Sequence, residues 1–337
     1  MNSKEFLDLI PFNGELNRFE SYEDISLSNI NSLSLVLSAS FLRKPRKIAV
    51  CLPTLYDAQT LMDGLMDYLN QDDVVFYPFD EVLRIESIGT SKEMVEERIN
   101  ALTSTCLDKP VIFITHSAAT IRLIRSKETF QSRIFTLEIN KVISRKELLE
   151  KISLAGYTRV NKVQHCFEYA LRGEILDIWS ANYLDPIRIE FFDETVEEIR
   201  VFHPETEISY KQIESITIVP ASEFSLSKEE KEVGSEKLLK ALSERKLPKL
   251  LFDELSERVR PNLDRILNEG MDETNSRYLL YFDDNCKTVS DYLSEFQVYI
   301  YHPIDFLSSA NNFENEEIDF FNDLYKNGQA LEKERIY

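Results

Sequence analysis

The chain has 337 residues, of which 43% are hydrophobic and 29% charged, and its formal net charge is -20 at pH 7. This length exceeds one ordinary domain and suits two or three domains, each with its own core. No apolar run approaches the roughly eighteen residues that a membrane-spanning helix needs, and the strong negative charge disfavours direct binding to nucleic-acid phosphates.

Residues 46–140 alternate short apolar runs with stretches of helical periodicity. The runs are rich in β-branched and aromatic residues and do not alternate with polar ones, which is typical of strands buried on both faces of a parallel sheet. They lie at 46–53, 73–78, 110–115 and 133–139, and the intervening helices at 54–69 and 91–107. The first helix places six residues on one sheet-facing stripe: Leu55, Ala58, Leu61, Met62, Leu65 and Leu69.

After a helix at about 144–154, residues 156–219 are predicted to form consecutive strands joined by short turns, as a compact antiparallel insert. The strands are expected at 157–163, 167–172, 174–179, 186–192, 195–202 and 215–220. Because neighbouring strand residues point to opposite sides, Arg188 and Glu190 should share the face opposite Ile187, Ile189 and Phe191.

From about Ser227 helices return, at 227–246 and 253–270, followed by a strand at 296–303. This tail is predicted to complete the first domain. The resulting boundaries are 1–130 for the first part of the parallel-sheet domain, 131–222 for the insert, and 223–337 for the helical and strand return together with the start of a linker.

Motifs of nucleotide and hydrolytic chemistry are absent from the sequence. The eight glycines form neither GxxxxGK[ST] nor GxGxxG, which need glycine so that backbone N–H groups can approach phosphate. The stretch SLSLVLSASFLRKP at 32–45, just before the first strand, has serines but no glycine. No GxSxG, HExxH or SxxK pattern fits its required context. We therefore expect no catalytic, cofactor-binding or metal-binding residue in this chain.

The four cysteines are far apart, form no CxxC pair, and are accompanied by four scattered histidines. A zinc site is not expected, because structural zinc sites show closely spaced ligand pairs. Free cysteines in apolar segments suit a reducing cytoplasm, and the N-terminus has no export signal pattern. We therefore expect a cytoplasmic location.

Several motifs of residues 156–206 occur in a fixed order: GYxR at Gly156 to Arg159, an aromatic-x-x-RG-x-(I/L)-(I/L)-(D/E)-I-aromatic stretch ending at Trp179, IRIEFF at Ile187 to Phe192, and IRVFHPET at Ile199 to Thr206. Together they resemble the small insert domain shared by UvrB and the transcription-repair coupling factor family, Mfd. The resemblance extends over most of residues 30–305. UvrB itself would require an intact Walker A motif and a long tyrosine-rich hairpin that inserts into DNA, and this sequence has neither.

This resemblance implies a degenerate RecA/P-loop-like parallel sheet with helices on both faces, interrupted by an antiparallel α+β insert. It also implies a non-catalytic N-terminal module that recruits the repair protein UvrA in transcription-coupled nucleotide excision repair. The segment 32–45 resembles the degenerate nucleotide loop of that module. ATP, Mg²⁺, RNA polymerase and DNA would be bound only by other domains of the parent translocase.

The residues that the resemblance assigns to UvrA binding are Arg159, Arg172, Gly173, Arg188 and Glu190. Arginine suits this role because its planar fork makes paired hydrogen bonds to carboxylates. The alternative is that these residues form ordinary surface ion pairs. Two positions depart from the pattern: Phe167 replaces the usual family glycine, and Ala170 stands where UvrB carries an arginine. The competing functions are a nucleotide-dependent enzyme of unusual motif and a UvrB-like damaged-DNA-binding protein.

Overall fold

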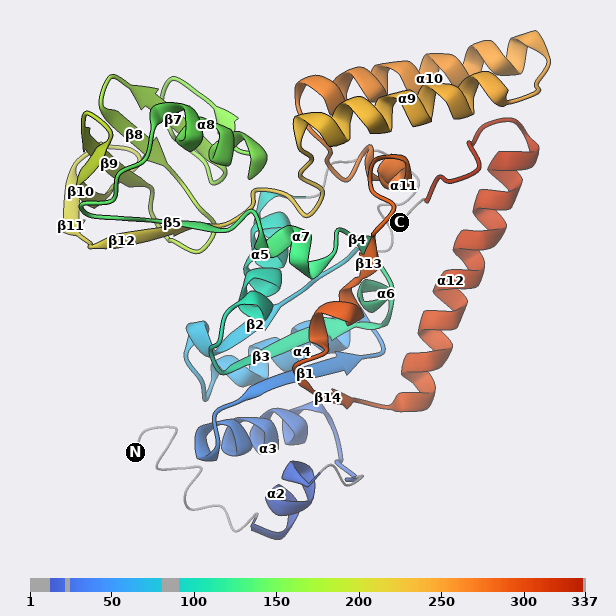
Figure 1. Ribbon diagram of the computed structural model, residues 1–337. Coiled ribbons are helices and arrows are strands. Elements are labelled where there is room, and N and C mark those ends of the chain that lie inside the picture. The colour runs from blue at the N-terminus through green and yellow to red at the C-terminus, as the bar shows by residue number, and fades with distance from the viewer. Residues whose placement is uncertain (1–12, 22–24, 81–90, 336–337) are drawn as a thin grey trace. The chain divides into compact units, whose positions relative to one another are not determined.

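The computed structural model describes residues 13–21, 25–80 and 91–335 (Figure 1). The contacts of the chain divide it into two compact units. The first contains the described parts of 1–82, 101–122 and 288–316, and the second contains those of 83–100, 123–287 and 317–337. The boundaries 1–130, 131–222 and 223–337 stay predictions.

The first unit holds a four-stranded parallel sheet with the strand order β14 (Gln297–Ile300), β1 (Lys47–Leu52), β3 (Val111–His116) and β2 (Val74–Phe76). Each residue of β3 is buried, and so are five of the six in β1, which explains why both strands read as unbroken apolar runs. The predicted parallel sheet and the late strand that returns to it are therefore confirmed. A short 3-10 turn, η1 (Gln71–Asp73), precedes β2.

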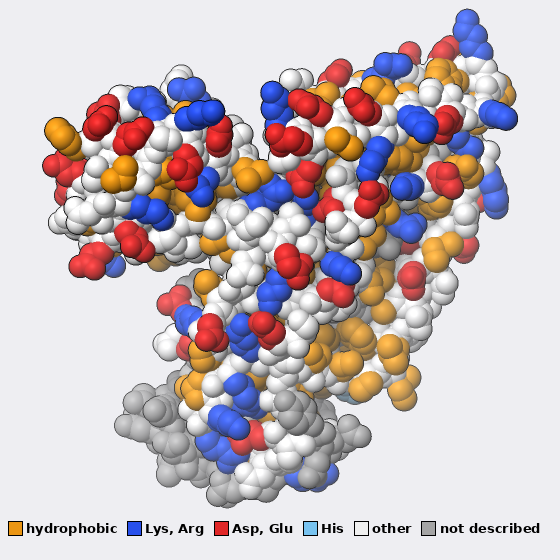
Figure 2. Space-filling view, viewed as in Figure 1, with side chains coloured by type: hydrophobic (Ala, Val, Ile, Leu, Met, Phe, Trp, Pro, Cys, Tyr) orange, Lys and Arg blue, Asp and Glu red, His pale blue; other side chains and the backbone are white. Residues whose placement is uncertain are grey.

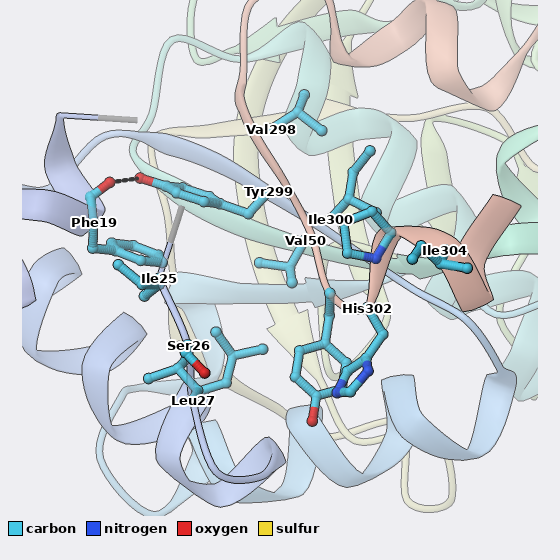
Figure 3. Close-up of a pocket in the computed structure, with 13 residues that line it drawn as sticks. Phe19, Ile25, Ser26, Leu27, Val50, Val298, Tyr299, Ile300, His302 and Ile304 are labelled. Carbon is cyan, nitrogen blue, oxygen red and sulfur yellow. Dashed lines mark hydrogen bonds between the residues drawn. The ribbon is translucent and has the colours of Figure 1, made fainter. Parts of the chain in front are cut away.

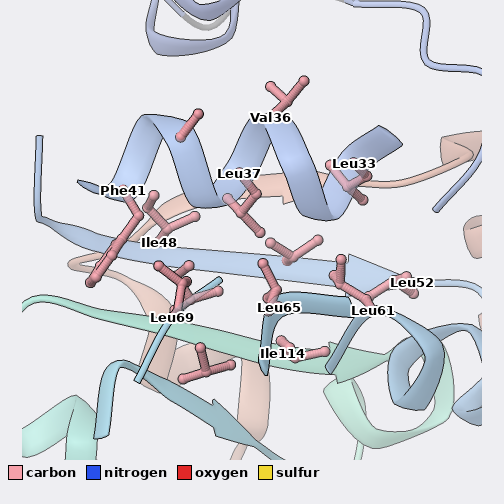
Figure 4. Close-up of a cluster of buried hydrophobic side chains, with 14 of the residues drawn as sticks. Leu33, Val36, Leu37, Phe41, Ile48, Leu52, Leu61, Leu65, Leu69 and Ile114 are labelled. Atoms are coloured by element: carbon pink, nitrogen blue, oxygen red, sulfur yellow. The ribbon is translucent and has the colours of Figure 1, made fainter. Parts of the chain in front are cut away.

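Helices α3 (Ile30–Arg43) and α4 (Leu55–Met66) cover one face of this sheet, and their apolar side chains meet those of β1 and β3 (Figure 4). The predicted stripe of the second helix is confirmed, since all six of its members belong to this cluster or pack against it. On the opposite face Ala49 and Phe113 are fully buried. The short helix α6 (Ser117–Thr120) contacts β1 and β3.

The segment 32–45 was expected to resemble a degenerate nucleotide loop, and this expectation was wrong for its structure. Most of it lies in α3, which begins after Asn29, whose side chain accepts a hydrogen bond from the N–H of Ser32 at 2.9 Å. Leu33, Leu37 and Phe41 recur at helical spacing and are buried, so packing on the sheet favours a helix here. The turn that joins β1 to its following helix is instead Pro53–Thr54.

The second unit contains a six-stranded sheet with the order β11 (Ser209–Gln212), β10 (Thr195–Phe202), β9 (Ile187–Phe192), β8 (Ile175–Ile178), β7 (Glu168–Arg172) and β6 (Thr158–Arg159). Its pairings are antiparallel except for β6 with β7, which is parallel. The antiparallel insert is thus confirmed, with two corrections: β6 runs parallel to its neighbour, and β11 was not predicted.

A further correction concerns the run at 133–139, which was expected to continue the alternation of the parallel sheet. It forms β5 (Phe135–Glu138), which pairs antiparallel with β12 (Ser215–Ile218). Helix α8 (Arg145–Leu154) contributes Leu148 and Ile152 to the core beneath the six-stranded sheet. Both β5 and β12 add residues to the same core, and of the four residues of β5 Leu137 is fully buried while Glu138 is exposed.

The remaining elements are mostly helical. They are α2 (Asn13–Glu20), α5 (Lys92–Cys106), α7 (Lys127–Gln131), α9 (Lys228–Glu244), α10 (Lys249–Asn268), α11 (Leu279–Phe282), α12 (Pro303–Lys326), the 3-10 turns η3 (Ser276–Tyr278) and η4 (Val289–Leu293), and the short strands β4 (Leu123–Ile124) and β13 (Lys287–Thr288). Helix α9 begins with a capping box in which Ser227 and Glu230 each bond the backbone of the other. No helix of the described residues is both long and apolar enough to span a lipid bilayer.

Candidate partner-binding face of the six-stranded sheet

The side of the six-stranded sheet opposite its core carries a cluster of charged residues in β7 to β10, and we call this side the polar face. The strand register places five of them in two rows across the sheet. The first row runs from Asp177 through Arg188 to Arg200, and the second pairs Glu190 with Glu198. Arg172 lies next to the second row, in β7. Ile187, Ile189 and Phe191 are buried in the core, so the alternation predicted for β9 is confirmed.

Asp177 is the centre of the polar face. It is only 1% exposed, and its carboxylate accepts hydrogen bonds from Arg188 Nε at 2.7 Å and Arg188 Nη2 at 2.9 Å. It also accepts one from Arg172 Nη2 at 2.6 Å. A buried carboxylate requires such partners, and here it fixes two of the arginines that the sequence singled out.

The Arg188 guanidinium is held from two sides. Its hydrogen bond to Asp177 raises the pKa of Arg188, outweighing the opposing effect of burial. The guanidinium also lies over the Phe202 ring, with its central carbon 4.8 Å from the ring centroid. Arg188 is therefore pre-positioned, whereas Arg172 is about half exposed and bonds Asp177 through Nη2. Arg172 Nη2 also lies 3.9 Å from Glu207 Oε1, and its Nε and Nη1 donate no hydrogen bond within the described residues.

Glu190 forms an ion pair with Arg200, which also approaches Glu198 at 3.5 Å. Glu190 and Glu198 lie directly opposite each other in the register of β9 and β10. Like charges at such positions are destabilising, so Arg200 offsets their repulsion.

Gly173 lies in the two-residue turn between β7 and β8, where Arg172 pairs with Ile175. Its φ of +61° is in the left-handed region, and a Cβ at this position would meet no atom within 4 Å. The position therefore favours glycine because of its backbone conformation, not because of crowding. In this way Gly173 sets the tight turn that brings Arg172 beside Asp177.

Arg159 is separated from the other predicted residues. In the parallel pairing of β6 with β7 it is registered with Tyr169, whose side chain packs in the core. Paired residues point to the same side of a sheet, so Arg159 lies on the side away from the polar face, at the edge strand. It is exposed and has no side-chain hydrogen bond or ion pair within the described part of the chain.

Three residues of the polar face were missed by the sequence reasoning: Asp177, Glu198 and Arg200. The signal for Asp177 was present, because an aspartate within the apolar run ILDI needs a buried partner.

Phe192, at the end of β9, follows the alternation of Arg188 and Glu190 and is 74% exposed. An exposed aromatic beside paired charges is typical of protein interfaces.

Phe167, which replaces the glycine expected from the resemblance, has a φ of +67°. This left-handed conformation is the one that glycine adopts without cost, which gives a physical reason for a glycine there. The Phe167 ring is half-buried and meets the Tyr157 ring edge-on, with centroids 6.3 Å apart. The packing of this ring compensates in part for the backbone strain.

The turn after β1, where folds with parallel sheets commonly bind phosphate, makes its own hydrogen bonds. Thr54 Oγ1 accepts a bond from the N–H of Asp57 at 3.1 Å and donates one to the Asp57 carboxylate at 2.7 Å. The carbonyl of Pro53 accepts a bond from Ser117 Oγ at 2.7 Å. A carboxylate thus already lies at the start of α4, where a phosphate would be placed.

Within the described ranges, no group of three or more His, Cys, Asp or Glu side chains is arranged to hold a metal ion.

Comparison with known proteins finds a family match within the second unit. Residues 135–224 match the UvrB interaction domain. The chain resembles the N-terminal module of transcription-repair-coupling factors. The factor of Bacillus subtilis is 28% identical over 287 residues, which is 84% of this chain and 24% of the relative.

Two staphylococcal transcription-repair-coupling factors are similar to the chain at comparable levels. That of Staphylococcus aureus strain RF122 is 27% identical over 74% of this chain and 20% of the relative. That of Staphylococcus haemolyticus is 25% identical over 79% of this chain and 22% of the relative. The chain therefore spans about a fifth to a quarter of the length of the curated relatives it matches.

Proposed function

We propose that this chain is a non-catalytic docking module that recruits UvrA through the polar face of its six-stranded sheet. The observation that carries the proposal is the arrangement around Asp177, within the region that matches the UvrB interaction domain. Arg172 keeps exposed guanidinium donors that can pair with a partner carboxylate. Phe192 adds an exposed apolar surface beside these charges, as interface anchors do.

The proposed contact residues are Arg172, Arg188 and Glu190, with Gly173 supporting the turn. Arg159 was predicted to join them from the resemblance. Its place on the other side of the sheet supports at most an indirect role, or a contact made around the β6 edge. Since Arg188 and Glu190 are already paired within the face, the strongest effect on UvrA binding is expected from Arg172.

We further propose that neither ATP nor Mg²⁺ binds to this chain. Support comes from the β1–α4 turn, which carries the Asp57 carboxylate at the helix start and offers no glycine-rich backbone. In this proposal, ATP hydrolysis, DNA translocation and contact with RNA polymerase belong to other segments of proteins such as the longer relatives. The module links repair enzymes to a translocase acting on stalled RNA polymerase.

The proposal is tested with purified UvrA and the 337-residue chain in an isothermal titration. A 1:1 complex of micromolar or tighter affinity is expected. Absence of heat and of co-elution on size exclusion would contradict the docking function.

Titration of the chain with ATP and Mg²⁺ tests the alternative that the chain is a nucleotide-dependent enzyme, because saturable micromolar binding would favour that alternative. A mobility shift with damaged duplex DNA at low salt separates the UvrB-like alternative, and no shift is expected.

A further inference from the structure

The edge of the parallel sheet in the first unit carries an apolar surface that the proposed function does not use. Strand β14 pairs with β1, and no other strand of the described residues pairs with it. Such an edge presents main-chain donors and acceptors that can pair with a further strand. Unlike many natural edges, β14 has no charged residue of its own, since it reads QVYI.

Four large apolar side chains are exposed at this edge and on the first turns of α12: Val298, Ile300, Ile304 and Leu307. We call them the β14 edge patch. Figure 2 shows hydrophobic side chains gathered over this part of the chain. The most exposed is Ile304, at 84%. Contiguous exposed apolar groups of this kind mark interaction sites in proteins.

The patch borders a pocket of about 680 Å³ within the same unit. In Figure 3 Ile25, Ser26 and Leu27 lie on one side of the pocket, and Val298, Ile300 and Ile304 lie on the other. Tyr299 is committed to the core: its ring stacks on Phe19 at 4.0 Å, and its hydroxyl donates to the Phe19 carbonyl at 2.6 Å. The pocket is therefore a groove along a firmly anchored strand.

The charge around the groove indicates the kind of partner that it fits. Residues 288–316 contain five acidic residues and no lysine or arginine. Two basic side chains of the neighbouring strand are already paired at the start of β14: Lys47 lies 3.2 Å from Glu295, and Arg46 donates a hydrogen bond to Gln297. Asp305, on the first turn of α12, is exposed beside Ile304 and lies 3.5 Å from His302. A second copy of the chain would bring another formal net charge of -20 to this surface, which disfavours self-association. A partner with positive charge is favoured by the same field.

We propose that the β14 edge binds an extended, apolar segment of another protein that carries lysine or arginine at its end. The segment adds a strand to β14 through main-chain hydrogen bonds, while alternate side chains enter the groove and contact the β14 edge patch. Its basic end lies near Asp305. This surface belongs to the first unit, so it is separate from the polar face and does not depend on UvrA binding.

The test measures fluorescence anisotropy of labelled peptides of about ten residues, a typical strand length, added to the 337-residue protein. The first peptide alternates valine and threonine between pairs of lysines. The second has the same core between pairs of glutamates, and the third is the lysine peptide with a central proline, which removes a main-chain donor. Binding of the first peptide, and at least about tenfold weaker binding of the other two, is expected.

Two variants and a matched control locate the site. Ile300→Lys places a charge on the strand edge, and Ile304→Lys changes a side chain too exposed to be needed for folding; each should weaken the first peptide about tenfold. Leu250→Lys, at a 70% exposed leucine of α10, should leave its affinity unchanged. Four results overturn the proposal: no binding of the first peptide, equal binding of the proline peptide, equal affinity of all three variants, or a dimer in sedimentation that Ile304→Lys abolishes.

Discussion

Asp177 and Arg188 face each other across β8 and β9, joined by two hydrogen bonds of 2.7 and 2.9 Å. The carboxylate is buried, whereas the guanidinium keeps part of its surface in solvent and rests on Phe202. The pair therefore combines a structural anchor with a group that a partner can reach. Interfaces gain affinity when such groups are fixed before binding, because less conformational freedom is lost on association.

The first prediction concerns Asp177→Asn. The amide keeps the shape of the side chain but cannot accept the charge-assisted bonds of two arginines, so Arg188 is left partly buried without its counter-charge. We expect the free energy of unfolding to fall by about 2–4 kcal/mol. Urea denaturation measures this change. Glu205→Gln, at an exposed loop acid, is the control and should change stability by less than about 0.5 kcal/mol. An Asp177→Asn variant as stable as this control would contradict the anchoring role.

The second prediction concerns the backbone of Phe167. Both Phe167→Ala and Phe167→Gly remove the ring contact with Tyr157, but only glycine relieves the positive φ of +67°. We therefore expect the glycine variant to be more stable than the alanine variant by about 1 kcal/mol. At Phe192, which has no such φ, the order should be reversed. Thermal or urea unfolding of the four variants measures these stabilities. If the alanine variant were more stable than the glycine variant at both positions, the backbone strain at Phe167 would be refuted.

The third prediction concerns pH. Burial lowers the pKa of His116 to about 4, and its Nε2 accepts a hydrogen bond from the N–H of Phe79 at 3.2 Å. An unfolded histidine titrates near 6.5. Above this pH the neutral ring is present in both states and the contribution of His116 to stability is complete. As the pH falls from 6.5 toward 4, His116 binds a proton in the unfolded chain but stays neutral in the folded chain. The free energy of unfolding therefore decreases over this range.

The size of this effect can be measured between pH 7 and pH 5, above the range in which most carboxylates titrate. The expected loss from His116 is about 2 kcal/mol. In His116→Gln the amide oxygen can still accept the Phe79 bond but does not titrate, so the loss over this interval should shrink by about that amount. An unchanged pH dependence in the variant would show that His116 is not the responsible group.

How much could be predicted from the sequence depended on the range of the interactions involved. Unbroken apolar runs predicted β1 and β3, because both faces of these strands are buried. Alternation predicted the face of Arg188, because one side of β9 meets the core. Both signals are local, which is why they were sufficient.

The errors came from pairing between distant segments. The direction of β6, and with it the side on which Arg159 lies, depends on its register with β7. Strand β5 pairs with β12, which lies about eighty residues later in the chain. The apolar residues of β5 do not by themselves indicate this pairing. The serine-rich stretch before β1 was compared with a loop, although its apolar residues recur at helical spacing. Asp177 was overlooked because its importance lies in two arginines of other strands.

The most direct test of the docking account is the affinity of purified UvrA for the wild-type chain and for Arg172→Ala. Arg260→Ala, at an exposed arginine of α10, serves as the matched control. Loss of a charge-assisted interface contact should weaken binding about tenfold or more in Arg172→Ala, with the affinity of Arg260→Ala unchanged and both variants folded. Equal affinity of all three proteins for UvrA would contradict the assignment of the polar face as the binding surface.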